Sequence, residues 1–342
     1  MELWSAAHGL FITARNAKYF QDGSEQTHHY YQNQDGVPSM EDYTNLKNCT
    51  ICPRECQVNR YEKTGFCKET VILRASRAAL HFWEEPIISG KGGSGAVFFS
   101  GCNMRCVFCQ NYNIATAQVG KEISVERLAE IFFELAEKGA HNINLVTPSH
   151  FILQIKKAIT LAKNQGLSLP IVYNTSSYEK VDTLKQLDGL VDIYLPDLKY
   201  FSTELSSRYS SAPDYFFIAS NAIAEMFRQV GTPQLSSDGL LQKGMVVRHL
   251  LLPGQSKDTK KVLRYLHETY GDQIYISIMN QYTPMPQVTS SDSFPELHRK
   301  VTEEEYHKIL TFSERLGISQ GFYQEGETAE ESFIPAFDYE GI

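Results

Sequence analysis

Seven cysteines are the residues of this sequence with the clearest capacity for chemistry, and all of them lie between residues 49 and 109 of the 342. Disulfide frameworks usually join separated parts of a small secreted chain, so crowding of this kind favours metal binding in a reducing compartment. The odd number of cysteines also argues against complete pairing. The cysteines form two sets with different spacings, and each set predicts its own metal centre.

Cys102, Cys106 and Cys109 have the spacing C-x3-C-x2-C in "SGCNMRCVFCQN" (100–111), directly after the apolar run 96–99. A structural zinc site uses four closed ligands, and a thioredoxin-like C-x2-C pair would leave Cys102 without a role. A [4Fe–4S] cluster takes one ligand per iron, so three thiolates leave one iron with the open position that metal catalysis requires. The spacing therefore favours a catalytic [4Fe–4S] cluster held by one compact loop.

The other four cysteines, Cys49, Cys52, Cys56 and Cys67, have the spacing C-x2-C-x3-C-x10-C. Four thiols suit either a closed tetrahedral zinc ion or a complete second [4Fe–4S] cluster. The sequence predicts a small metal-binding module over residues 49–70 and leaves both metals open. A zinc ion would make the module structural, whereas a cluster could relay electrons or hold substrate.

The segments that must position these cysteines follow from hydrophobic periodicity. Short β-branched or aromatic runs alternate with amphipathic stretches about six times from residue 96 onward. The predicted strands are 96–100, 142–147, 170–175, 191–195, 245–252 and 274–279, and the predicted helices are 124–138, 150–165, 178–187, 213–230, 257–270 and 302–316. Such alternation means a parallel sheet covered by helices. Because six units fall short of a closed eight-fold barrel, we expect an α/β fold, a partial (β/α)6 TIM-like barrel, with its chemistry at the C-terminal ends of the strands.

The whole chain reads as four parts. These are an irregular N-terminal arm (1–48) with at most one helix near residues 10–20, the cysteine-rich module (49–70), the barrel (90–285), and a C-terminal helix and tail packed on the barrel (286–342). The composition, 42% hydrophobic and 21% charged with a net charge of -8, predicts neither a nucleic-acid partner nor an anionic membrane partner. No apolar run approaches the roughly 18–20 residues that span a bilayer, and the first residues lack signal-peptide features, so we expect a cytoplasmic protein.

The C-x3-C-x2-C motif after the first strand of a partial barrel resembles the signature of radical S-adenosylmethionine (radical SAM) enzymes. The resemblance implies a [4Fe–4S] cluster on Cys102, Cys106 and Cys109 whose open iron is chelated by S-adenosylmethionine (SAM). It implies an oxidoreductase in which one electron from the reduced cluster cleaves SAM to a 5′-deoxyadenosyl radical that abstracts hydrogen. It also implies an electron donor such as flavodoxin or ferredoxin, and it places Phe108 beside the adenine.

The segments "CVFCQN", "PDLK" and "RHLLLPG" extend the resemblance, over about residues 45–340, to the pyruvate formate-lyase activating branch and its uncharacterised relatives. This branch has a D-x-K element beside SAM, which assigns Asp197 and Lys199 to the cofactor, and Arg248 is expected to face the same pocket. The branch's GGE element is replaced here by "VTPSH" (146–150). We therefore expect the hydroxyl of Thr147 or Ser149 to take its place, and Asn174, at the end of the third strand, to join the same rim.

Three functions remain open. The chain could activate a glycyl radical enzyme, which would be a protein substrate. It could instead modify a small molecule or a peptide. It could also be a non-catalytic metal-binding scaffold, although the presence of all three cluster cysteines argues against that. An activase is expected to leave the barrel mouth wide, whereas an enzyme for small substrates is expected to close it with residues 280–342.

Overall fold

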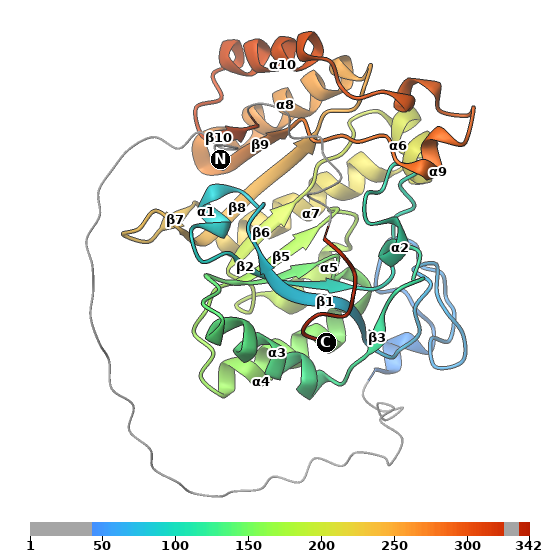
Figure 1. Cartoon of the computed structure of the whole chain (residues 1–342), viewed down its shortest axis with the longest axis vertical. Helices are drawn as coiled ribbons and strands as arrows, with labels where there is room; N and C mark the ends of the chain where they lie inside the picture. The colour runs from blue at the N-terminus through green and yellow to red at the C-terminus, as the bar shows by residue number, and fades with distance from the viewer. Residues whose placement is uncertain (1–42, 325–334) are drawn as a thin grey trace, which may run out of the picture.

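The computed structural model describes residues 43–324 and 335–342, so most of the predicted N-terminal arm lies outside the described residues. A ten-stranded sheet forms the centre of the molecule and helices lie along its outer side (Figure 1). The strands are β1 Arg74–His81, β2 Ser94–Phe99, β3 Lys121–Glu122, β4 Ile143–Val146, β5 Ile171–Thr175, β6 Ile193–Pro196, β7 Gln234–Leu235, β8 Leu241–Leu250, β9 Tyr275–Met279 and β10 Gly321–Tyr323. The α-helices are α1 Pro86–Ser89, α2 Tyr112–Ala115, α3 Val125–Glu137, α4 Ile152–Asn164, α5 Val181–Leu184, α6 Thr203–Ser210, α7 Tyr215–Val230, α8 Ser256–Tyr270, α9 Pro286–Thr289 and α10 Glu303–Leu316.

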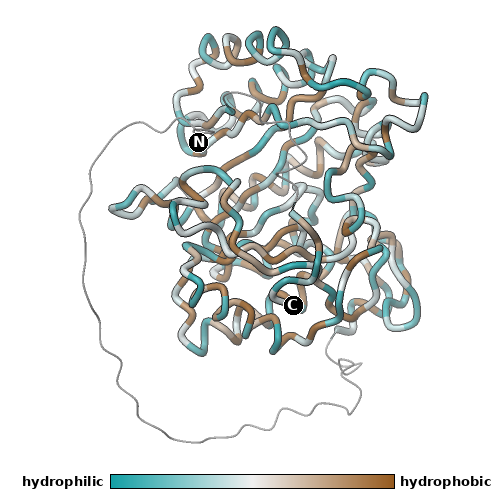
Figure 2. Tube along the Cα trace, viewed as in Figure 1, coloured by the Kyte–Doolittle hydropathy of each residue, from teal (hydrophilic) through white to brown (hydrophobic). Residues whose placement is uncertain are grey.

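All six predicted strands form, and they lie side by side in the order β2-β4-β5-β6-β8-β9 with every neighbouring pair parallel. Every residue of β2, β4, β5 and β6 is buried, because helices cover one face and side chains fill the other. The hydropathy colouring shows these strands as apolar segments in the interior and polar residues along the outer helices (Figure 2). The predicted α/β fold, a mostly parallel sheet of the partial TIM-like barrel type, is confirmed.

The sheet is longer than the sequence predicted. Strand β1 pairs antiparallel with β2 and carries β3 on its other edge, while β10 continues the parallel sheet beyond β9. Strand β8 begins at Leu241, four residues before the predicted start at 245, because its first residues form a hairpin with β7. Helix α6 was also missed, and the predicted helix 178–187 is only the short α5 followed by a 3-10 turn. These additions occupy the sheet edges and connections, where periodicity is weakest.

Local signals account for the helices that cover the sheet. The Ser124 hydroxyl accepts a hydrogen bond from the backbone N–H of Arg127 and starts α3, and Gly139, with φ +89°, follows its end. Helix α10 begins with a complete capping box between Thr302 and Glu305. Within the parts of the chain that the structure covers, no helix is long and apolar enough to cross a membrane.

Two segments outside the repeating strand–helix pattern pack against the barrel. Residues 43–70, which carry the first four cysteines, form irregular loops beside α2 and the loop that follows β2 (Figure 1). The C-terminal residues 335–342 run along β1, where the N–H of Tyr339 donates to Ser76 O (3.1 Å) and the N–H of Ala78 donates to Glu340 O (2.7 Å). The first segment therefore lies near the C-terminal ends of the parallel strands, and the second lies along β1.

Candidate active site

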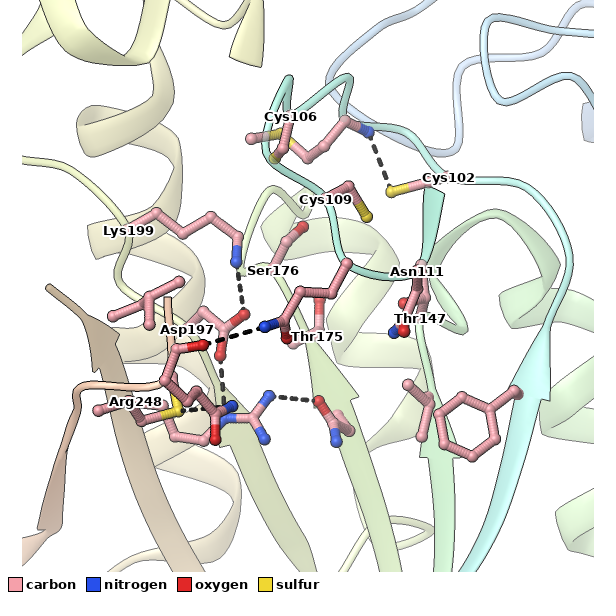
Figure 3. Close-up of a pocket in the computed structure, with 18 of the residues that line it drawn as sticks. Cys102, Cys106, Cys109, Asn111, Thr147, Thr175, Ser176, Asp197, Lys199 and Arg248 are labelled. Atoms are coloured by element: carbon pink, nitrogen blue, oxygen red, sulfur yellow. Dashed lines mark hydrogen bonds and ion pairs between the residues drawn. The ribbon is translucent and has the colours of Figure 1, made fainter. Parts of the chain in front are cut away.

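The loop after β2 carries Cys102, Cys106 and Cys109 at the C-terminal end of the sheet, where a parallel barrel keeps its active site (Figure 3). The loop turns at Gly101, which has φ +80°. A Cβ at this position would lie 2.5 Å from Cγ of Glu69 and 2.6 Å from the carbonyl oxygen of Cys67, so only glycine fits. The turn therefore brings the cysteine loop into close contact with the N-terminal module.

The three thiols line one cavity of about 260 Å³. The backbone N–H of Met104 donates to the Cys102 sulfur (3.4 Å) and the Ser210 hydroxyl donates to the Cys106 sulfur (3.0 Å). Burial and then the charge of neighbouring cysteines raise the pKa of Cys102 above its ordinary value and that of Cys109 to about 12. The thiols of Cys102 and Cys109 therefore favour the protonated form until a metal supplies positive charge.

The donor set suits an iron–sulfur cluster. Within residues 43–324 and 335–342, no group of three or more His, Cys, Asp or Glu side chains is arranged to hold a single metal ion. The cysteine loop instead offers three sulfurs to a shared cavity, and N–H and O–H groups point at two of them. Hydrogen bonds of this kind to ligand sulfurs orient them and tune cluster potentials. The residues present therefore fit a [4Fe–4S] group with one position open toward the cavity.

A charged network faces the cysteines across the cavity (Figure 3). Arg248 on β8 pairs with Asp197 (Nε–Oδ1, 2.9 Å), and Lys199 pairs with the other oxygen of that carboxylate (Nζ–Oδ2, 2.6 Å). Burial opposes ionisation of Asp197, but the charges of Arg248 and Lys199 outweigh it and hold the pKa of that carboxyl below its usual value. Asn174 Oδ1 accepts from the same guanidinium (2.7 Å). The structure thus brings these four predicted residues together in one cavity.

Glu84 completes this network and was missed by sequence reasoning. It lies between β1 and α1, is 9% exposed, and its Oε2 pairs with Arg248 at 2.9 Å. Its Oε1 accepts from the amides of Asn144 and Asn174, each at 3.1 Å. The available signal was a pair of adjacent carboxylates before Pro86 in the otherwise apolar "HFWEEPII". It was overlooked because Glu84 does not follow a strand of the predicted barrel.

The segment that replaces the GGE element divides its two hydroxyl residues between the cavity and the core. Thr147 lines the cavity with φ +58°, a left-handed conformation that is costly for a β-branched residue. Its N–H donates to Asn174 O (2.9 Å). Ser149 does not line the cavity: it is buried and its hydroxyl donates to Glu179. Of the two predicted alternatives, Thr147 is the one that the structure places beside the cysteines.

Aromatic and amide side chains enclose the rest of the cavity. Phe108 lines it and is held edge-on between Tyr209 and Tyr282, with ring centroids 6.4 Å and 6.2 Å away. The Gln287 side chain donates to the carbonyl of Cys109 (2.8 Å), which ties the segment after β9 to the cysteine loop. Sequence reasoning also missed several lining residues: His81, Trp83, Met104, Gln110 and Pro335. Two of them, His81 and Trp83, come from β1 and the loop after it, which the sequence did not assign to the site.

His150 belongs to the support of the cysteine loop and not to the cavity. It is 1% exposed, and its Nε2 lies 2.6 Å from the carbonyl oxygen of Ser100. Burial, and then the charge of Arg60, lower the pKa of His150 to about 3, so the imidazole stays neutral. It therefore fixes the backbone just before Cys102.

The four remaining cysteines gather in the N-terminal module. Cys49, Cys52 and Cys67 are buried and Cys56 is half-buried. The buried Gly65 allows close approach, because a Cβ there would lie 3.3 Å from the sulfur of Cys56 and 3.5 Å from that of Cys67. Burial, and then the neighbouring thiols, raise the pKa of Cys52 to about 12. Burial therefore disfavours the thiolate form of Cys52, as it does for Cys102 and Cys109.

The chain has recognisable relatives. It is 30% identical over 287 residues to an uncharacterized protein of Methanocaldococcus jannaschii, which covers 80% of this chain and 76% of that protein. A radical SAM methyltransferase from Sphaerobacter thermophilus gives a TM-score of 0.47 at 15% identity, covering 68% of this chain and 67% of that one. A domain of a pyruvate-formate lyase-activating enzyme from Bacteroides vulgatus gives a TM-score of 0.39 at 12% identity, covering 55% of this chain and 100% of that one.

The family model described as the Radical SAM superfamily matches residues 96–266. This span runs from within β2 into α8 and contains the cysteine loop, Thr147, Asn174 and the Asp197–Arg248 network. The match covers most of β2 and all of the parallel strands β4, β5, β6 and β8, whose C-terminal ends converge on the cavity. The chain therefore belongs to the radical SAM superfamily.

Proposed function

We propose that the chain binds a [4Fe–4S] cluster on Cys102, Cys106 and Cys109 and cleaves SAM reductively to abstract hydrogen from a substrate in the same cavity. When bound and reduced, the cluster supplies one electron to the sulfonium of SAM, which gives methionine and a 5′-deoxyadenosyl radical. One observation carries this proposal: the three cysteines and the network of Asp197 and its partners line opposite sides of one cavity.

The residues of the chain bind and orient SAM in this proposal. Lys199 and Arg248 present cationic donors to the cavity and stay charged because Asp197 and Glu84 balance them. Such fixed, charge-assisted donors suit the carboxylate and hydroxyl groups of SAM. Phe108 offers an apolar face for the adenine.

In this proposal Thr147 helps to orient SAM through its backbone. It has a left-handed conformation just after β4, where its N–H still donates to Asn174 O of β5. Strain at a cavity residue of this kind persists only where the surrounding structure enforces it. We assign Thr147 to the amino group of SAM, the part of the cofactor that the GGE element would otherwise hold.

The substrate that we propose is a small molecule or a peptide. Residues 281–287 lie against the cysteine loop, and Pro335 lines the same cavity from the C-terminal segment. These segments restrict access to the cavity and help to exclude water from a reactive radical. Activation of a glycyl radical enzyme, the alternative, requires that a loop of a large protein reach past them.

Anaerobic assay of 5′-deoxyadenosine tests the cofactor chemistry. After reconstitution with iron and sulfide, we expect the wild-type protein to form 5′-deoxyadenosine from SAM with dithionite. The Cys102→Ala/Cys106→Ala/Cys109→Ala variant should form none. A reconstituted wild-type protein that also forms none would support the non-catalytic scaffold.

Fractionated cell extract distinguishes the two classes of substrate. We expect the low-molecular-mass fraction to accelerate formation of 5′-deoxyadenosine, and the protein fraction to have no such effect. Acceleration by the protein fraction alone, with a new radical signal in that fraction, would favour the activase.

A further inference from the structure

We infer that the N-terminal module, residues 49–70, holds a redox-active [4Fe–4S] cluster that passes electrons from a protein donor to the catalytic loop through Cys67 and Cys102. The inference rests on the proposed function, because the electron needs a cluster on the loop after β2 as its acceptor. Two independent observations carry it: a buried cation within the module, and a direct backbone contact between cysteines of the two sites.

Arg60 is the buried cation. Its side chain is 0% exposed, and its guanidinium donates to the carbonyl oxygens of His150 (2.6 Å) and Thr70. No carboxylate in the described parts of the chain pairs with it, and its Nε has no hydrogen-bond partner there. A buried charge without a counter-charge is strongly destabilising. The charge of Glu69 acts on Arg60, but Glu69 pairs with Arg74, so further negative charge next to the Arg60 guanidinium would stabilise the folded module.

The four thiols are the source of that charge. Burial raises the pKa of Cys49 and of Cys67, and the charge of the neighbouring Arg60 opposes that rise in both. Four thiolates around zinc or around a [4Fe–4S] cluster give a centre with net negative charge, since the thiolates outnumber the positive charges of the metal core. Arg60 therefore indicates that the module holds a metal centre and not four neutral thiols.

The contact between the two sites favours a redox metal over zinc. The N–H of Cys102, the first cysteine of the catalytic loop, donates to the carbonyl oxygen of Cys67, the last cysteine of the module (3.3 Å). Arg54 reinforces the contact, because its Nε donates to Asn103 O (2.8 Å) and its guanidinium also reaches Ser211 O (2.6 Å). A structural zinc ion is redox-inert and gains nothing from this proximity. A cluster gains a short path from one ligand to the next.

The four thiols also differ in their access to solvent. Cys56 is half-buried, whereas Cys49, Cys52 and Cys67 are buried. An electron donor can thus approach the module on the side of Cys56, and the electron leaves on the side of Cys67. The donor, a reduced flavodoxin-type protein, loses one electron; the module cluster is reduced and then reoxidised; the electron finally breaks the carbon–sulfur bond of SAM. No proton is transferred in the relay.

Metal analysis of anaerobically purified protein tests the nature of the module. We expect about eight irons in the wild-type chain and about four in the Cys102→Ala/Cys106→Ala/Cys109→Ala variant, without zinc. About four irons with one zinc in the wild type, and only zinc in the variant, would refute the relay and leave the proposed function intact. A variant that keeps all the iron would instead refute the proposed function.

Reduction kinetics test the relay itself. With wild-type protein, we expect flavodoxin hydroquinone and dithionite both to reduce the catalytic cluster. The reduction is monitored by the electron paramagnetic resonance signal of that cluster. In Cys56→Ala, flavodoxin should no longer reduce the catalytic cluster in the time that it needs with the wild-type protein, whereas dithionite still reduces it. Reduction by flavodoxin at the wild-type rate, in a variant that has lost the module iron, would overturn the relay.

Arg60→Gln keeps every ligand and covers the case in which Cys56→Ala does not fold. Removal of a positive charge beside an anionic cluster should make its reduction potential more negative with the iron content unchanged. Arg315→Gln, an exposed arginine on α10, is the matched control and should leave the potential unchanged. Equal potentials in the wild type and Arg60→Gln would show that the guanidinium does not face a redox centre, and would overturn the inference.

Discussion

Glu84 shows how single residues set the electrostatics of the cavity. Its carboxylate pairs with Arg248, as that of Asp197 does, and it also joins the amides of β4 and β5 to that guanidinium. Because both ions are largely buried, removal of one charge leaves the other poorly compensated. We therefore propose that the network is a rigid frame for SAM, with Glu84 as a positioning residue behind it.

We predict that Glu84→Gln weakens SAM binding by roughly tenfold, or about 1.4 kcal/mol, because the orientation of Arg248 is relaxed. The affinity can be measured by titration of SAM into reconstituted protein, with iron content as a check on cluster assembly. Glu137→Gln, at an exposed position at the end of α3, is the control and should bind SAM as the wild type does. Unchanged affinity in Glu84→Gln would remove this residue from the cofactor site.

At the scale of elements, the cysteine loop depends on a turn that only glycine can make. Gly101 combines a left-handed backbone with close contacts to the N-terminal module, so the loop and the module are fitted to each other. The sequence shows this glycine only as the residue before Cys102. Its crowding comes from Glu69 and Cys67, which lie more than thirty residues earlier.

Gly101→Ala should displace the cysteine loop and abolish assembly of the catalytic cluster, while the iron of the module remains. Gly166→Ala is the matched control, since Gly166 also has a positive φ (+97°) but nothing within 4 Å of an added Cβ. It should lose only about 1 kcal/mol of stability and keep all of its iron. Iron analysis and 5′-deoxyadenosine formation measure both effects. Full activity in Gly101→Ala would mean that the loop tolerates a shift at this contact.

At the scale of the whole molecule, buried ionisable groups make stability depend on pH. Glu179 is 1% exposed and accepts hydrogen bonds from Ser149 and Thr175. Burial outweighs these hydrogen bonds and raises the pKa of Glu179 to about 7. Because the native state binds this proton more tightly than the unfolded state, the contribution is complete below the unfolded pKa and is lost as the pH rises to about 7.

We predict that Glu179→Gln removes this loss, which amounts to about 3 kcal/mol between about pH 5 and about pH 8. The free energy of unfolding of Glu179→Gln, measured anaerobically with denaturant, should then increase relative to that of the wild type as the pH rises. Other groups, His150 among them, titrate equally in both proteins and cancel in the difference. A difference that is independent of pH would show that Glu179 stays ionised in the native protein.

The sequence alone determined the parallel sheet and the cysteine loop. Strands buried on both faces give continuous apolar runs, and the ligands Cys102, Cys106 and Cys109 lie within one loop, so neither needs distant information. The strand-end rule also indicated Asp197, since parallel strands bring their C-terminal ends to one rim, whereas Arg248 was expected there from the family resemblance. Spacing within a segment was sufficient in each case.

The tertiary structure alone decided which distant groups meet. It placed Glu84 against Arg248, turned Thr147 into the cavity and Ser149 into the core, and brought Cys67 to Cys102. Each of these depends on backbone direction or on contacts between separate segments, and a local pattern carries neither. The sequence could therefore predict two sets of cysteine ligands, whereas the contact between Cys67 and Cys102 became visible only in the folded chain.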